Sequence, residues 1–136
     1  MKNLISDVKK IQFKNNVNSS GSLSVFQARE LVPFDIKRVF VVSAIEREER
    51  GHHAHIRCSQ LLVAVCGEIQ VRVFDGMQQS MTFNLNKMNE GLLIPPGIWA
   101  SQRYIQEKSV LMVLCDNEYN ESDYIRDFKK YLEIYK

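Results

Sequence analysis

The chain has 136 residues, of which 45% are hydrophobic and 25% charged, and its 18 lysines and arginines nearly balance its 16 aspartates and glutamates. This length and composition suit one globular domain, and the interleaved charges argue against a nucleic-acid-binding segment. No window approaches the roughly 18 apolar residues of a membrane span, and the N-terminus lacks the apolar core of a signal peptide. We therefore expect residues 1–136 to form a single domain that binds neither nucleic acid nor a membrane.

Most of the chain consists of short apolar or alternating segments separated by turn residues, a pattern typical of strands. These segments cover residues 23–26, 36–42, 60–66, 69–74, 81–85, 91–94 and 109–115. Ile69, Val71 and Val73 share one strand face, and Asp75-Gly76 behind them is a hairpin turn signal. The pattern predicts an all-β sandwich or barrel.

Only the end of the chain has helical spacing. Its aromatic residues recur four, three and four positions apart: Tyr124, Phe128, Tyr131 and Tyr135. Asn120 and Asp123 precede the last three at the spacing of a capping pair. This arrangement predicts a C-terminal helix whose first turn follows Asn120.

The cysteines Cys58, Cys66 and Cys115 are an odd number without a Cys-x-x-Cys spacing. Cys66 and Cys115 lie in apolar runs, where a thiol usually packs as a small hydrophobic group. Because unpaired thiols are typical of a reducing compartment, we expect a cytoplasmic protein.

All three histidines lie within residues 52–55. In an extended strand alternate residues share a face, so His53 and His55 are predicted to point one way and His52 the other. Such histidines can bind a metal, act as a catalytic acid and base, or simply be exposed on a strand. Two imidazoles on one face favour a functional site.

Two segments resemble the conserved motifs of the cupin superfamily. The first is Gly51-x-His53-x-His55 followed by Gln60 and Gly67, and the second is residues 91–100 with their Pro-x-Gly turn. The resemblance implies a cupin-type double-stranded β-helix, a jelly-roll barrel, here with a C-terminal α-helix.

The same motifs bear on metal binding. Where metal-binding cupins carry a glutamate and a third histidine, this chain has Gln60 and Ala100. A zinc or iron site needs three or four protein ligands, and an amide and a methyl group do not replace the missing two. We therefore expect no metal cofactor and favour acid–base chemistry by the imidazoles, which titrate near neutrality.

Nearly the whole chain resembles a narrower family, the sugar 3,4-ketoisomerases that act on dTDP-4-keto-6-deoxyglucose. The resemblance rests on five segments: residues 33–40, 50–55, 59–63, 95–99 and 117–126. It implies that the keto group moves from C4 to C3 through an enediol without any redox cofactor, in the biosynthesis of 3-amino-3,6-dideoxy sugars for bacterial surface glycans.

The resemblance also implies roles for particular residues. His53 and His55 match the catalytic histidines. The candidate substrate-binding residues are Arg38, Arg50 and Arg57 for the diphosphate or the keto oxygen, Gln60 for a sugar hydroxyl, Trp99 for the pocket wall, and Ser20 and Ala100 for the face of the sugar that is protonated at C4.

This chain departs from the family at three places. Phe40 and Val41 stand where members commonly carry tyrosine, so an expected phenolic donor is missing. Ser20 and Ala100 replace larger polar residues, which leaves the C4 configuration of the product, gluco or galacto, open. Two other functions stay open: a non-catalytic nucleotide-sugar-binding cupin and a metal-dependent cupin enzyme.

We also expect a homodimer. Ile11 and Phe13 lie on one face of a strand at residues 9–14, flanked by lysines, a pattern suited to pairing across a subunit boundary. Similar ketoisomerases are dimers that exchange N-terminal strands. The alternative is that this segment closes the sheet of its own chain.

Overall fold

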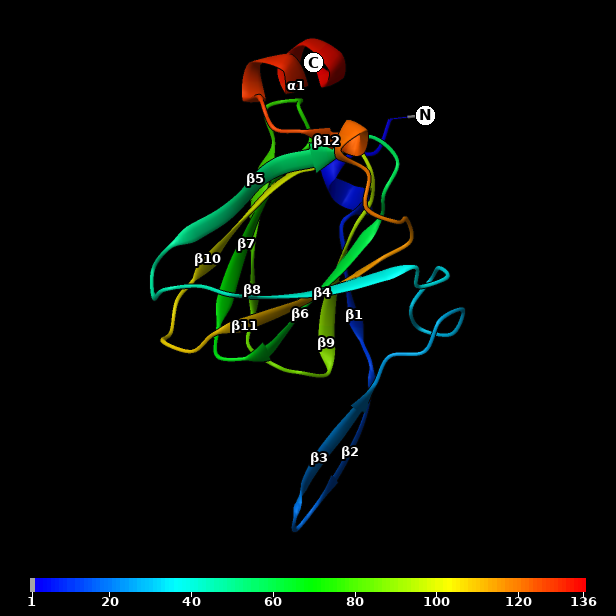
Figure 1. The fold of residues 1–136 in the computed structure, drawn as a ribbon, viewed down its shortest axis with the longest axis vertical. Coiled ribbons are helices and arrows are strands. Elements are labelled where there is room, and N and C mark those ends of the chain that lie inside the picture. The colour runs from blue at the N-terminus through cyan, green and yellow to red at the C-terminus, as the bar shows by residue number, and fades with distance from the viewer. Residues whose placement is uncertain (1) are drawn as a thin grey trace.

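The computed structural model describes residues 2–136, most of which form antiparallel strands (Figure 1). The strands are β1 (Lys9–Gln12), β2 (Lys14–Asn18), β3 (Gly21–Val25), β4 (Arg38–Ser43), β5 (Glu49–His55), β6 (Gln60–Cys66), β7 (Ile69–Phe74), β8 (Ser80–Leu85), β9 (Glu90–Ile94), β10 (Trp99–Tyr104), β11 (Val110–Cys115) and β12 (Tyr124–Ile125). The helices are the short 3-10 turns η1 (Ile5–Asp7) and η2 (Glu121–Asp123) and the C-terminal α1 (Phe128–Tyr135). None of these helices is long and apolar enough to cross a membrane.

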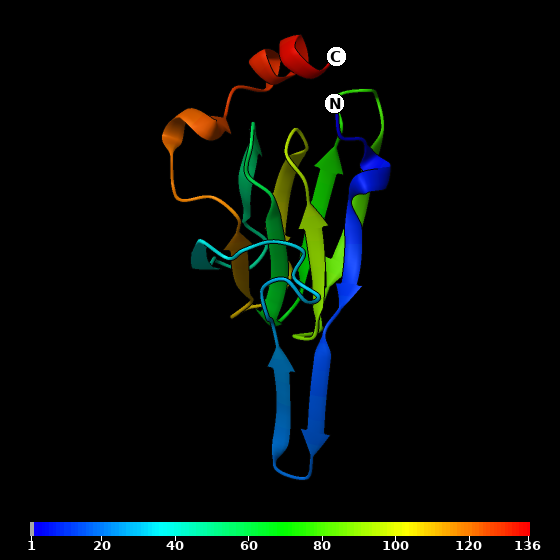
Figure 2. The same ribbon diagram turned by 90° about the vertical axis from the view of Figure 1, so that its right-hand side faces the viewer.

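Two five-stranded sheets face each other and form the barrel. One has the order β1-β9-β6-β11-β4 and the other β12-β5-β10-β7-β8. Strands β2 and β3 pair only with each other and form a hairpin that projects from one end of the barrel, while α1 lies at the opposite end (Figures 1 and 2). The prediction of an all-β barrel with a C-terminal helix is confirmed.

The core between the sheets follows the predicted alternation. Ile69, Val71 and Val73 of β7 are fully buried on one face, and β7 pairs with β8 across the Asp75-Gly76 turn. Strand β6 is buried on both faces, because Leu62 and Ala64 pack between the sheets while Leu61 and Val63 pack under the loop that carries Val32 and Phe34. This double burial explains why β6 is a continuous apolar run.

The predicted start of the C-terminal helix is wrong. The Asn120 side chain accepts a hydrogen bond from the Ser122 backbone, but it caps only the single turn η2. The chain then extends as β12, which pairs with β5, and α1 begins after Asp127, whose carboxylate accepts from two backbone N–H groups. Pairing with β5 therefore overrides the local helical signal around Tyr124.

The N-terminal segment pairs with a strand of the same chain. Strand β1 pairs with β9 of its own sheet, from Lys9 opposite Leu93 to Gln12 opposite Glu90. The side chain of Phe13, just beyond β1, is buried. The element that lies outside both five-stranded sheets is the β2–β3 hairpin that follows.

Candidate active site

A cavity of about 380 Å³ opens between the two sheets. Its polar wall comes mainly from β5 and β10: Glu49, Arg50, Gly51, His52, His53, Gln102 and Tyr104. Its opposite wall comes from β4, β6 and β11 and is apolar apart from one amide: Phe40, Val42, Gln60, Leu62, Leu111 and Val113. Tyr124 and Arg126 complete the lining. The cavity is therefore amphipathic, which suits a ligand with one polar and one apolar face.

A β-bulge in β5 sets the histidines in place. Ala100 of β10 pairs with His53 while the next residue, Ser101, pairs with Gly51, so His52 is the extra residue. Gly51 and His52 have φ values of +93° and +54°. At Gly51 the positive φ favours glycine, and a Cβ atom would also lie 3.1 Å from the Ala100 carbonyl oxygen.

The two histidines predicted to share a face do so. The rings of His53 and His55 meet edge to face, with centroids 5.0 Å apart, whereas Ala54 between them packs toward α1. His52 is exposed at the edge of the cavity because the bulge turns it out of the regular alternation.

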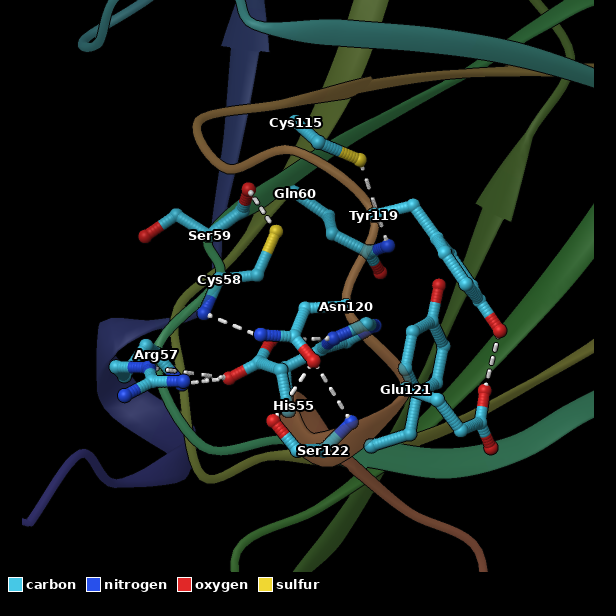
Figure 3. A network of polar contacts seen from close by, with 12 residues as sticks. His55, Arg57, Cys58, Ser59, Gln60, Cys115, Tyr119, Asn120, Glu121 and Ser122 are labelled. Atoms are coloured by element: carbon cyan, nitrogen blue, oxygen red, sulfur yellow. Dashed lines mark hydrogen bonds and ion pairs between the residues drawn. The ribbon is translucent and has the colours of Figure 1, made fainter.

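His55 is anchored by Asp123, a residue that sequence reasoning did not single out. Its Nδ1 lies 3.0 Å from Asp123 Oδ2, and both side chains are buried. The same carboxylate accepts backbone hydrogen bonds from Arg57 at 2.7 Å and from Cys58 at 3.3 Å (Figure 3). A carboxylate can only accept, so His55 carries its proton on Nδ1, and its Nε2 presents a lone pair.

The environment keeps both imidazoles neutral. Burial lowers the pKa of His53 to about 4, and the neighbouring His55 acts in the same direction. Burial also lowers the pKa of His55, although Asp123 opposes this effect. His53 Nδ1 and His55 Nε2 are buried without a hydrogen-bond partner among residues 2–136. Each histidine therefore has one ring nitrogen without a hydrogen-bond partner in the described residues, and of the two histidines His53 is the one that lines the cavity.

An aromatic and basic cluster stands beside the histidines. The Tyr124 ring is centred 4.3 Å from the His55 ring and 5.1 Å from the His53 ring. The guanidinium of Arg126 lies 4.4 Å from the centre of the Tyr124 ring and forms an ion pair with Glu121. Tyr124, Arg126 and Glu121 belong to residues 117–126, one of the segments on which the family resemblance rests. That resemblance is the feature of the sequence from which these site residues could have been predicted.

Four of the seven predicted substrate-binding residues lie at or near the cavity. Arg50 and Gln60 line it, and Ala100 pairs with His53. Arg38 lies beside the Tyr124 edge of the cavity, where its Nη1 donates to the Tyr124 hydroxyl at 3.3 Å. Its Nη2 lies 3.6 Å from the Cys115 sulfur.

The other three lie elsewhere in this chain. Trp99 alternates with Ala100 on β10, so its ring faces outward and packs against Phe128 and Tyr131, beside a second hollow that lacks the histidine pair. The Arg57 side chain is 64% exposed. Ser20 lies in the turn of the projecting hairpin.

One group of side chains has the composition of a metal site. Ligand atoms of His55, Cys58 and Asp123 lie within 4.8 Å of one another, and all three residues are buried. Hydrogen bonds already account for this arrangement, since His55 is bonded to Asp123 and the Cys58 thiol donates to the Ser59 carbonyl at 3.3 Å.

Comparison with known proteins shows the family of the chain. The family described as "FdtA: WxcM-like, C-terminal" matches residues 6–136. A TDP-4-oxo-6-deoxy-alpha-D-glucose-3,4-oxoisomerase from Aneurinibacillus thermoaerophilus is 38% identical over 129 residues, which cover 91% of this chain and 91% of that protein.

Solved structures give the same result. QdtA, a sugar 3,4-ketoisomerase from Thermoanaerobacterium thermosaccharolyticum in complex with TDP, is 30% identical and superposes with a TM-score of 0.92 over 97% of this chain and 96% of its own. For WlaRA, a TDP-fucose-3,4-ketoisomerase from Campylobacter jejuni, the identity is 27% and the TM-score 0.87, with 96% of each chain covered. The rmlC epimerase of Mycobacterium tuberculosis, 17% identical, shares the fold with a TM-score of 0.77 over 90% of this chain and 70% of its own. The chain belongs to the FdtA family of cupin-like sugar 3,4-ketoisomerases.

Proposed function

We propose that this protein isomerises TDP-4-keto-6-deoxyglucose to the corresponding 3-keto sugar, with His53 and His55 as the catalytic residues. The observation that carries the proposal is a pair of neutral imidazoles in edge-to-face contact, of which His53 lines the polar side of the cavity and His55 is oriented by Asp123. The relative from Aneurinibacillus is named for this conversion, and a variant of QdtA was solved with TDP-4-keto-6-deoxyglucose bound.

The chemistry is proton transfer between neighbouring carbons. A neutral imidazole removes the proton from C3, which is acidified by the C4 ketone, and an enediol forms. Loss of the C3 hydroxyl proton and delivery of a proton to C4 then complete the 3-keto product. The sugar is neither oxidised nor reduced overall, so the reaction needs no external electron acceptor.

The cavity lining suggests how the sugar nucleotide is held. Arg50 and Arg126 carry the positive charge that a diphosphate requires. The Gln60 amide can bond a sugar hydroxyl from the opposite wall. The apolar side chains around Gln60, such as Leu62 and Val113, suit the methyl group at C6.

Incubation with TDP-4-keto-6-deoxyglucose in D2O tests the proposal. We expect a 3-keto product in NMR spectra and deuterium at the sugar carbons. The variant His53→Asn should abolish both signals, whereas His52→Asn should keep them. A protein that binds the sugar nucleotide, as measured by calorimetry, but incorporates no deuterium would be a binding module and not an isomerase.

We further propose that the protein is a homodimer in which the β2–β3 hairpin packs on the second subunit. An isolated two-stranded hairpin is at best marginally stable in water, and this one exposes Val17 and Leu23 to 70% and 59%. The edge strand β4 also exposes the apolar side chains Val39 and Val41. Exchange would bring Ser20, in the hairpin turn, to the partner.

Sedimentation at micromolar concentration tests this arrangement. We expect the mass of two chains, and the mass of one chain when residues 14–25 are replaced by a short glycine-rich turn. A monomer with full activity would exclude the exchanged dimer. We also propose a cytoplasmic location, because all three cysteines are free thiols.

A further inference from the structure

Tyr104 carries a buried hydroxyl group that the proposed function has not used. It is the last residue of β10, its side chain is 0% exposed, and it lines the cavity on the same strand face as Gln102. Its hydroxyl oxygen has no hydrogen-bond partner among residues 2–136. An unpaired buried hydroxyl destabilises a folded protein, so its presence calls for an explanation.

Tyr131 shows how the same fold treats a tyrosine with a structural role. It is also fully buried, but its hydroxyl group lies 2.9 Å from the Phe74 carbonyl and 2.8 Å from the Gly97 carbonyl. The Tyr104 hydroxyl has no such acceptor. On the opposite wall of the cavity Phe40, Val42 and Leu111 cannot accept a hydrogen bond, and the Gln60 amide is not bonded to this hydroxyl.

The phenol of Tyr104 is a permanent donor at neutral pH. Burial raises its pKa to about 12, and the nearby Arg50 opposes this effect. The other unpartnered buried atom on the cavity lining is His53 Nδ1. His53 pairs with Ala100, four residues before Tyr104 on the same strand, so the two backbone positions lie about 13 Å apart along β10. The imidazole and the phenol therefore line one cavity from the neighbouring strands β5 and β10.

We propose that the Tyr104 hydroxyl donates a hydrogen bond to the keto-derived oxygen of the bound sugar and stabilises the negative charge that develops there. The inference rests on the proposed isomerase function. It assigns a phenolic donor to a chain that has Phe40 and Val41 where similar enzymes commonly carry tyrosine. The donor reaches the substrate from β10, on the wall that faces Phe40.

The test compares Tyr104→Phe with Tyr131→Phe, two changes that each remove one buried hydroxyl group. The measurements are kcat and KM for TDP-4-keto-6-deoxyglucose, the melting temperature, and the shift in melting temperature on adding the sugar nucleotide. For Tyr104→Phe we expect kcat/KM to fall about 10- to 100-fold, mainly through kcat, with an equal or higher melting temperature. For Tyr131→Phe we expect wild-type kinetics and a melting temperature lower by about 4 °C.

Two results would overturn the inference. Wild-type kinetics in Tyr104→Phe would mean that the hydroxyl does not meet the reacting sugar. A melting temperature lowered as much as in Tyr131→Phe would mean that the hydroxyl is bonded within the free protein, for example through water. Failure of the isomerase function itself is separate, because it would appear as absent activity in the wild-type protein.

Discussion

Replacing Asp123 by asparagine should inactivate the enzyme by changing the tautomer of His55. The aspartate accepts the Nδ1 proton of His55 at 3.0 Å, which leaves Nε2 as the basic nitrogen. Asparagine keeps one oxygen, and this oxygen can still accept the Arg57 backbone hydrogen bond at 2.7 Å. The new amide NH2 group then faces His55, so Nδ1 must become the acceptor and the proton moves to Nε2. His55 then lacks a lone pair toward the ligand.

The expected magnitudes follow from these contacts. Loss of a general base costs about 10²- to 10⁴-fold in rate, and we expect kcat to fall within that range. Loss of the charge-assisted bond, together with the new clash of the amide with the Cys58 N–H, should lower the free energy of unfolding by about 1.5–3 kcal/mol. Because Asp123 raises the pKa of His55, its removal lowers that pKa further, so protonation cannot restore the lost function at neutral pH.

Deuterium incorporation in D2O and thermal unfolding measure the two effects separately. Asp116→Asn is the matched control, because the Asp116 carboxylate also accepts a backbone hydrogen bond, from Ser59 at 2.8 Å, but lies outside the cavity lining. We expect this control to retain wild-type kinetics. A folded Asp123→Asn protein with kcat within about threefold of wild type would refute the tautomer argument.

Three further predictions concern the histidines and metals. His53→Asn and His55→Asn should each fold and lose most activity while His52→Asn is mild, since His52 is the exposed bulge residue; equal losses at all three positions would contradict this. Chelators should leave turnover unchanged, because Gln60 and Ala100 stand where metal-binding cupins carry a glutamate and a histidine; rescue of a chelated enzyme by a divalent metal would show the opposite. The free energy of unfolding should decrease as the pH is lowered from about 6.5 to about 4. In this window the histidine of the unfolded chain binds a proton, whereas His53 of the folded protein stays neutral. The difference between the two pKa values amounts to about 3 kcal/mol, so the melting temperature of His53→Asn should depend less on pH in this window.

The sequence predicted best those elements whose burial is periodic. Residues 60–66 and 69–74 coincide with β6 and β7, because one is buried on both faces and the other on alternate positions. The same periodicity placed His53 and His55 together. Strand β10 was not predicted, since it presents Ala100, Gln102 and Tyr104 to the interior and so lacks an apolar stripe. A strand that lines a polar cavity loses the pattern by which strands are recognised.

The features that the sequence did not predict depend on contacts between residues far apart in the chain. Asp123 meets His55 across 68 positions of sequence, and no local pattern marks an aspartate as the partner of a particular histidine. The misplaced helix start has the same origin, because residues around Tyr124 satisfy a helical spacing but gain more from pairing with β5. The hydroxyl of Tyr104 is informative only because it lacks a partner, which a sequence cannot reveal.

The single carboxylate gives the two histidines different properties although they lie on one strand face. His55 is bonded to Asp123, so its tautomer and ring orientation are set before the ligand arrives. His53 has no such partner at its Nδ1 in the described residues, so no carboxylate fixes its tautomer. An isomerase needs a group of each kind, because one proton must leave a defined carbon while others move among the oxygens of the enediol. Desolvation lowers the pKa of both imidazoles, so the neutral form that a general base requires is favoured at neutral pH.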